Sequence, residues 1–193
     1  MPDSGIDMLL QRPSRELIEE YSARFEQKNA KPENAIRLLC EKFPDNKSLE
    51  SILLKSIVIN TLYATQIHAI VSVAEHIFTL DVDNDLLRGV PDVVDKIAKV
   101  TIKGKQRNNY SFATKYCSFH NPNAYPIYDS FVVRLLTAYQ KLDTFSTFDT
   151  AGLRDYEEFK RVLNEFQSFY ELADISLKKL DMFLWGYGKE LFR

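Results

Sequence analysis

The sequence predicts an all-α protein. Apolar residues recur at helical spacing along most of the chain, which is typical of amphipathic helices packed on a core. The 193 residues include only six Gly and seven Pro, so few positions interrupt a helix. The apolar fraction of 45%, with 12% aromatic residues, is that of a globular protein. A chain of this length can form one domain or two interleaved helical lobes.

The first part of the chain is expected to form scaffold helices. Ser14 can cap a helix that runs to about Asn29, and Pro32 suits the first turn of the next helix, which Pro44 ends. The segment from about 46 to 63 carries apolar residues on several sides and predicts a central, buried helix.

Two further helices and two charged segments follow. The helices are expected at 66–80 and from Pro91 onward. Between them, the acidic segment 81–85 lacks the glycine and the closing glutamate of an EF-hand loop, so it predicts a solvated turn. The segment Lys96–Arg107 then holds five basic residues and no acidic one. Such a run is usually a solvated surface, but it can also contact phosphate groups.

Residues 111–136 predict a helix, a short proline-containing loop and a second helix. The first helix has one apolar stripe, and Ser111, Lys115 and Ser118 share its opposite face, which is expected to point outward. Asp129 is a preferred N-cap residue for the second helix. An Asp in this position is usually only a cap, but the amides at the helix start also favour its negative charge. Asp129 can therefore act beside a cationic intermediate.

Two amphipathic helices are expected to close the chain, from about Arg154 to Leu172 and from Ser176 to the end. No glycine-rich phosphate loop, zinc motif or nucleophilic triad is recognisable anywhere in the sequence. The candidate functional residues are therefore those in and around the central segment, residues 111–136.

That segment resembles the core of the helix-hairpin-helix DNA glycosylases, the superfamily of endonuclease III and the adenine-mismatch glycosylases. In their pattern a Lys or Ser, one further residue and an Ala open a helix, and an Asp follows the Ala by sixteen positions. Ser111, Ala113 and Asp129 stand in that register. The segment Tyr125–Asp129 also resembles the Phe-Pro-Ile-Leu-Asp of the adenine-mismatch branch. A second segment, Ala64–Ala74, resembles the early helix that follows the DNA-wedging loop of endonuclease III.

The resemblance implies a two-lobed helical fold of the glycosylase type. The N- and C-terminal helices, about 1–48 and 137–193, would form one lobe, and about 49–136 the lobe with the hairpin and the Asp motif. The implied activity is removal of a flipped, modified or damaged base from DNA, in repair or in defence against phage. Asp129 would stabilise the oxocarbenium-like transition state.

Two more residues receive catalytic roles, Ser111 from the resemblance and Lys115 from its place on the same helix. Ser111 stands where bifunctional relatives have the attacking lysine. The adenine-mismatch branch also has Ser there and is monofunctional, so base removal without strand cleavage is expected. Lys115 lies one turn later on the same face, and helical side chains lean toward the helix start, so its amine can reach Ser111 and act as the nucleophile. The alternative interpretation of Lys115 is a surface lysine or a phosphate contact.

DNA contacts are also implied. The family hairpin grips phosphates through the backbone amides of a Gly-apolar-Gly turn. This chain has Arg107-Asn108-Asn109 in that register, and Asn tolerates left-handed backbone angles better than other non-Gly residues. We therefore expect Lys103, Lys105, Arg107, Asn108 and Asn109 to contact DNA.

Three aromatic residues complete the expected site. Tyr63 stands where the family has a Gln that fills the gap left by a flipped base, and it can do so by stacking. Its alternative role is part of a helix-to-helix junction. Tyr128 and Trp185 are candidate walls of a base pocket, although a single Trp belongs most often to a core.

Composition excludes several other classes. The two cysteines cannot supply the four ligands of the iron–sulfur cluster found in many endonuclease III relatives, and His68 and His76 lack metal-ligand spacing, so no cofactor or metal is expected. The formal net charge of −2 means that DNA binding would depend on a local basic patch. No apolar run has the length of a membrane span, and residues 1–16 are too acidic for a signal peptide, which predicts a cytoplasmic protein.

The alternative function is a non-catalytic helical module that binds nucleic acid or another protein on a glycosylase-like scaffold. The absence of the glycine turn favours this alternative. The register of Asp129 and the basic run before Ser111 favour the enzyme.

Overall fold

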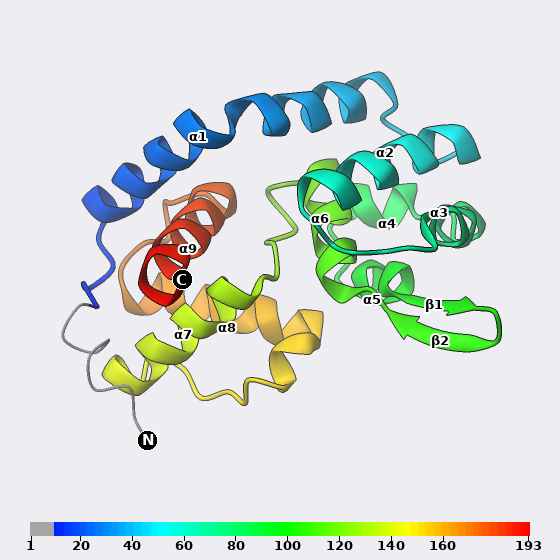
Figure 1. Cartoon of the computed structure of the whole chain (residues 1–193). Coiled ribbons are helices and arrows are strands. Elements are labelled where there is room, and N and C mark those ends of the chain that lie inside the picture. Colours follow the sequence, from blue (N-terminus) through cyan, green and yellow to red (C-terminus); the bar gives the residue numbers. More distant parts are fainter. Residues whose placement is uncertain (1–9) are drawn as a thin grey trace. The chain divides into compact units, whose positions relative to one another are not determined.

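The structure, a computed structural model, describes residues 10–193 and is mostly helical (Figure 1). The expected all-α class is confirmed, with one small hairpin added. Residues 1–9, which make up most of the segment expected not to be a signal peptide, lie outside the described part. The elements are α1 (Arg15–Lys42), α2 (Leu49–Leu62), α3 (Ile70–Thr79), α4 (Asp83–Arg88), α5 (Asp92–Ala98), β1 (Lys99–Ile102), β2 (Lys105–Asn108), α6 (Tyr110–His120), α7 (Ser130–Asp143), a 3-10 turn (Gly152–Arg154), α8 (Tyr156–Phe169) and α9 (Leu177–Phe192).

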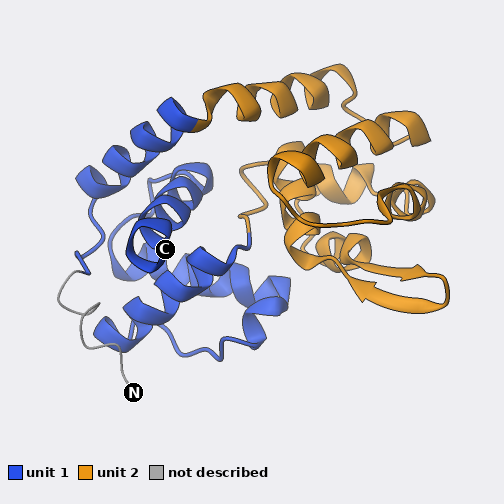
Figure 2. Ribbon diagram, in the orientation of Figure 1, with its two compact units in different colours: residues 1–28, 128–193 blue, residues 29–127 orange. Residues whose placement is uncertain are grey.

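The chain divides into two compact units (Figure 2). Unit 1 contains residues up to Lys28 and Tyr128–Arg193, and unit 2 contains Asn29–Ile127. The sequence places the two lobe divisions near 48 and 136. Helix α1 passes through the first division, four residues before Pro32. Since Pro32 has no N–H, the carbonyl of Lys28 loses its helical donor at that division.

Unit 1 is built on the contact between α7 and α9. A Cβ atom on Gly188 would lie only 2.7 Å from the backbone oxygen of Phe131, so the two helices approach closely at this glycine. The first half of α1 is fastened to this pair by Arg15, which pairs with Asp174 just before α9. Buried aromatic rings fill the rest of the unit, among them Tyr139, Phe145, Phe166, Tyr170 and Phe183.

Unit 2 packs α2 on α3 and α5 on α6. Lys55 of α2 is fully buried, and its three ammonium hydrogens have three acceptors. They are the carbonyls of Phe43 at 3.1 Å and Asp45 at 2.8 Å, and Oδ1 of Asn46 at 2.8 Å. This lysine therefore fixes the turn between α1 and α2.

The N-terminal half of the chain corrects three sequence predictions. The two helices expected on either side of Pro32 form one continuous helix, because helix-forming Ala and Glu neighbours continue the helix through the proline. The helix expected from residue 66 begins at Ile70, since Ala64 and Gln66 adopt positive φ angles of 48° and 59°. The acidic turn expected at 81–85 contributes to helix α4.

The basic run forms an antiparallel β-hairpin that extends from the end of α5 (Figure 1). Its turn is Lys103-Gly104, with positive φ at both residues, as two-residue hairpin turns require. The turn expected at Asn108-Asn109 is wrong. Asn108 pairs with Lys99 at the end of β2, and Asn109 is the N-cap residue of α6.

Candidate functional site

Ser111 and Lys115 lie one turn apart at the start of α6 and are in direct contact. The Lys115 Nζ atom donates to Ser111 Oγ at 2.7 Å, and it lies 3.4 Å from the Ser111 backbone oxygen. The lysine reaches back toward the helix start, as the side-chain geometry of helices predicts. An amine is thus held beside a hydroxyl group in the first turn of the helix.

Lys115 is only 3% exposed, which corrects the expectation of an outward polar face. Ser118 on the same face is also buried, at 3%. The reason is that α6 packs against α2, α4 and α5 at once, so almost its whole circumference is covered. Ser111 keeps partial exposure. The surface-lysine interpretation of Lys115 is therefore wrong.

Tyr63 lies at the end of α2 and contacts the same pair. Its ring centroid is 5.6 Å from Lys115 Nζ, a cation–π distance, and 5.8 Å from the ring of Phe119. Its hydroxyl group donates to the carboxylate of Glu33 in α1. The structure thus brings together three residues that the sequence singled out, Tyr63, Ser111 and Lys115.

Glu33 is the member of this group that sequence reasoning missed. It is 30 residues from Tyr63, and no motif surrounds it. Its position directly after Pro32 gave the only local signal, because a carboxylate there suits a helix start. The observed α1 has no helix start at that point, so the signal pointed to a cap and not to a contact with α2.

The loop after Tyr63 is held by a single side chain, Asn60 of α2. Its Oδ1 accepts from Thr65 Oγ1 at 2.7 Å and from the Ile67 amide at 3.0 Å, and its Nδ2 donates to the Ile67 carbonyl at 3.0 Å. These bonds support the unfavourable φ angles of Ala64 and Gln66. The segment expected to begin a helix is instead a tethered loop beside the Tyr63–Lys115 contact.

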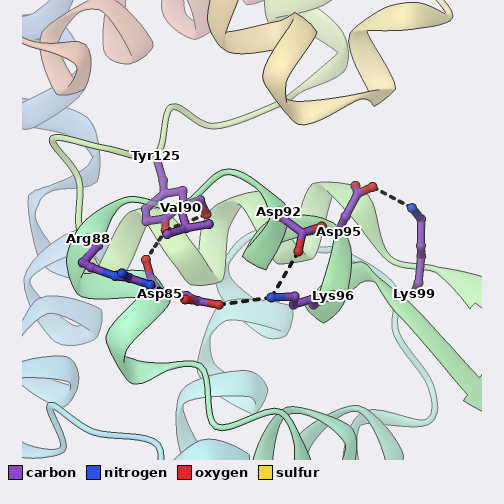
Figure 3. A network of polar contacts seen from close by, with 8 residues as sticks. All are labelled: Asp85, Arg88, Val90, Asp92, Asp95, Lys96, Lys99 and Tyr125. Carbon is purple, nitrogen blue, oxygen red and sulfur yellow. Dashed lines mark hydrogen bonds and ion pairs between the residues drawn. The ribbon is translucent and has the colours of Figure 1, made fainter.

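The base of the β-hairpin is electrically neutralised (Figure 3). Lys96 forms ion pairs of 3.1 Å with both Asp85 and Asp92, and Lys99 pairs with Asp95 at 2.6 Å. Hydrogen bonds to Asp92 and Asp85 raise the pKa of Lys96. Two of the five basic residues in the run are therefore committed to carboxylates of unit 2.

The three cations of the turn and the second strand, here called the hairpin tip, differ from the two at the base. Lys103, Lys105 and Arg107 are exposed, and none of the three forms an ion pair with another residue in the described range 10–193. These three cations are therefore available to an anionic partner. Asn108 is exposed beside them, whereas Asn109 is partly covered at the start of α6.

The loop that leads away from α6 is anchored inside unit 2. Tyr125 donates to the carbonyls of Asp85 at 3.0 Å and Val90 at 3.1 Å (Figure 3), and Asn121 donates to the carbonyls of Leu86 and Leu87. Tyr125, the first residue of the segment that resembles the adenine-mismatch branch, is thus buried and connects the loop after α6 to the end of α4.

Asp129, Tyr128 and Trp185 belong to unit 1. Asp129 is the N-cap residue of α7 and accepts from the Phe131 amide at 3.0 Å, as predicted. Tyr128 meets the ring of Phe159 edge-on at 5.5 Å. Trp185 is half-buried, with the ring of Phe25 at 5.5 Å and Lys189 Nζ 4.2 Å from its centroid. The expected site residues are thus distributed over both units.

Cys40 and Cys117 are free and buried, and burial raises the pKa of both thiols. Within residues 10–193, no group of three or more His, Cys, Asp or Glu side chains is arranged to hold a metal ion. None of the helices in the same range has the length and apolarity needed to cross a membrane.

Comparison with known proteins places the chain beside a family and a relative. The model of the HI_0787_N family, described as an N-terminal domain, matches residues 16–124, which is more than half of the chain. An uncharacterized protein of Haemophilus influenzae is 45% identical over 149 residues, which cover 77% of this chain and 71% of that protein. No solved structure matches the chain significantly.

Proposed function

The chain belongs to the HI_0787_N family, and we propose that it removes a modified or damaged base from DNA. The observation that carries the proposal is the 2.7 Å contact between Lys115 and Ser111 at the start of α6. The glycosylase resemblance expects a catalytic group at Ser111, and helix geometry brings the Lys115 amine to the same place. The hairpin tip, whose Arg107 stands four residues before Ser111, supports DNA as the partner.

The reaction begins with a nucleotide rotated out of the duplex, because the glycosidic bond is inaccessible inside the base stack. Breaking that bond leaves positive charge on the sugar ring, and the proposal assigns its stabilisation to the carboxylate of Asp129. A water molecule then adds to C1′ and loses a proton, the departing base takes up a proton, and the products are an abasic site and the free base. Ser111 would bind the sugar or the water through its hydroxyl group, with Lys115 holding that hydroxyl in place.

Base removal without strand cleavage is the expected outcome. A lyase would need the Lys115 amine to attack C1′ directly, but Lys115 is buried and its amine donates to Ser111. Ser111, the more exposed member of the pair, cannot form the imine that lyase chemistry requires.

The test is incubation of the full chain with duplex oligonucleotides that carry a panel of modified bases, with released bases detected by mass spectrometry. The proposal expects at least one free base and an abasic strand that is cleaved only after alkali. Borohydride trapping on abasic DNA checks the second part, because a covalent adduct that is lost in Lys115→Ala would contradict the monofunctional mechanism.

A second candidate is a nucleic-acid-binding module without catalysis. The observation that favours it is the β-hairpin, which replaces the amide-lined glycine turn of the glycosylases with exposed side chains. Salt-sensitive DNA binding without base release from any duplex of the panel would support this module and oppose the enzyme.

A further inference from the structure

The Lys115–Ser111 pair is covered by a residue that is itself held from a distant helix. Tyr63 lies with its ring 5.6 Å from Lys115 Nζ, and its hydroxyl donates to Glu33, which is in α1. Glu33, Tyr63 and Ser111 are each partly exposed, while Lys115 is buried. The amine is therefore enclosed by side chains that reach the surface.

The backbone beside Tyr63 does not by itself fix this arrangement. Tyr63 follows the last residue of α2 and has non-helical angles, φ −103° and ψ 6°. The next residues pass through two positive φ values and are tethered by the Asn60 side chain. Backbone conformations of this kind persist only where the surrounding structure holds them. Asn60 holds the loop backbone, and the hydrogen bond to Glu33 holds the Tyr63 ring.

We propose that Glu33 is a positioning residue that holds Tyr63 over Lys115, and that the Tyr63 ring keeps the amine against Ser111 and shielded from solvent. The role that this gives the pair in catalysis rests on the proposed function, but the shielding itself does not. A cation beside an aromatic face is stabilised where it lies, and a ring fixed by a charged hydrogen bond cannot rotate away easily.

The experiment is reductive methylation of the full chain with formaldehyde and a borane reductant, with the rate at each lysine followed by mass spectrometry. Exposed Lys103 gives the rate of an accessible amine. Lys55, fully buried in the same unit, reports any general loosening. In the wild type we expect Lys115 to react far more slowly than Lys103.

Glu33→Ala is expected to raise the rate at Lys115 about tenfold, the effect of losing one charge-assisted hydrogen bond, with the rate at Lys55 unchanged. Tyr63→Phe should act in the same direction because it removes the other half of that bond. Glu33→Gln should retain the slow rate, since its amide oxygen still accepts from the tyrosine hydroxyl.

Two results would overturn the proposal. One is a Lys115 rate that does not change in Glu33→Ala, and the other is a parallel increase at Lys55, which would mean that the variant only loosens unit 2. Methylation is read without DNA, so its result is independent of base release. A chain that shows the expected rates but releases no base would refute the proposed function and leave the positioning role intact.

Discussion

Gly188 of α9 lies directly against the backbone of Phe131 in α7. A Cβ atom there would be 2.7 Å from the Phe131 oxygen and 3.1 Å from its carbonyl carbon, and neither backbone atom can move without shifting the helix. We expect Gly188→Ala to lower the free energy of unfolding by about 1–3 kcal/mol, as overpacking of a close contact does. Urea denaturation of the full chain measures this.

Gly152→Ala is the matched control in the same unit. Its added Cβ would meet only the Glu158 side chain, at 3.9 Å, which is an ordinary contact distance. This variant should unfold within about 0.5 kcal/mol of the wild type. Equal stability of the two variants would show that α7 and α9 can separate at Gly188 without cost.

The stability of the chain should decrease in mild acid because of His120. Burial, with Lys55 nearby, lowers the pKa of His120 from 6.5 to about 3, so the imidazole stays neutral in the folded chain where the unfolded chain binds a proton. Above pH 6.5 His120 is neutral in both states and does not change the free energy of unfolding. As the pH falls from 6.5 toward 3, the unfolded chain binds a proton that the folded chain does not, so the free energy of unfolding decreases. The slope in that window reaches about 1.4 kcal/mol per pH unit.

Unfolding free energies at several pH values between 7 and 5 test this expectation. In His120→Phe the ring packing on Tyr116 is kept but the proton-binding group is gone, so the decrease between pH 6.5 and 5 should be much smaller. His68→Gln, at an exposed position, is the control and should follow the wild type. Parallel curves for the wild type and His120→Phe would assign the acid sensitivity to other groups.

The helices of the C-terminal half can be predicted from the sequence because capping residues mark where they begin and no distant contact overrides these caps. Asp129 caps α7 as expected, and Ser176 caps α9 by accepting from the Lys179 amide. The hairpin was missed because strands of four residues are too short to show a period of two. The break expected at Pro32 was wrong because one proline lowers helix stability without dictating an end.

In the candidate site, too, local contacts could be predicted from the sequence and contacts between distant segments could not. The contact of Lys115 with Ser111 follows from their spacing of four residues within one helix, and sequence alone predicted it. The burial of Lys115 depends on helices α2, α4 and α5, and the bond from Tyr63 to Glu33 joins two separate helices. Neither has a periodicity or motif that a single sequence reveals.

Asp129→Asn should separate catalysis from stability. Asn is as good an N-cap residue as Asp, so its side-chain oxygen can still accept from the Phe131 amide, and the free energy of unfolding should change by less than about 0.5 kcal/mol. The variant has no negative charge, so base release from the duplex that the wild type processes should fall about 10²–10³-fold. Asp155→Asn, which keeps the cap of α8, is the control and should retain activity. Full activity in Asp129→Asn would remove Asp129 from the mechanism.

The salt dependence of DNA binding should depend on the tip of the hairpin and not on its base. Lys103, Lys105 and Arg107 are exposed without ion pairs among residues 10–193, so each can release about one counterion from a phosphate. The slope of log K against log salt concentration, where K is the DNA-binding constant, is negative. Replacing all three residues by Ala should make it less steep by about 2.7, measured by fluorescence anisotropy on one duplex.

The matched control for this triple variant removes two other cations of the same run. Lys96 and Lys99 already pair with Asp85, Asp92 and Asp95, so Lys96→Ala/Lys99→Ala removes charges that are neutralised in the free protein. Its salt slope should change by less than about one, since each lost cation also leaves a carboxylate near the hairpin base. If the base variant reduces the slope as much per charge as the tip variant, or if neither changes it, the hairpin tip is not the phosphate contact.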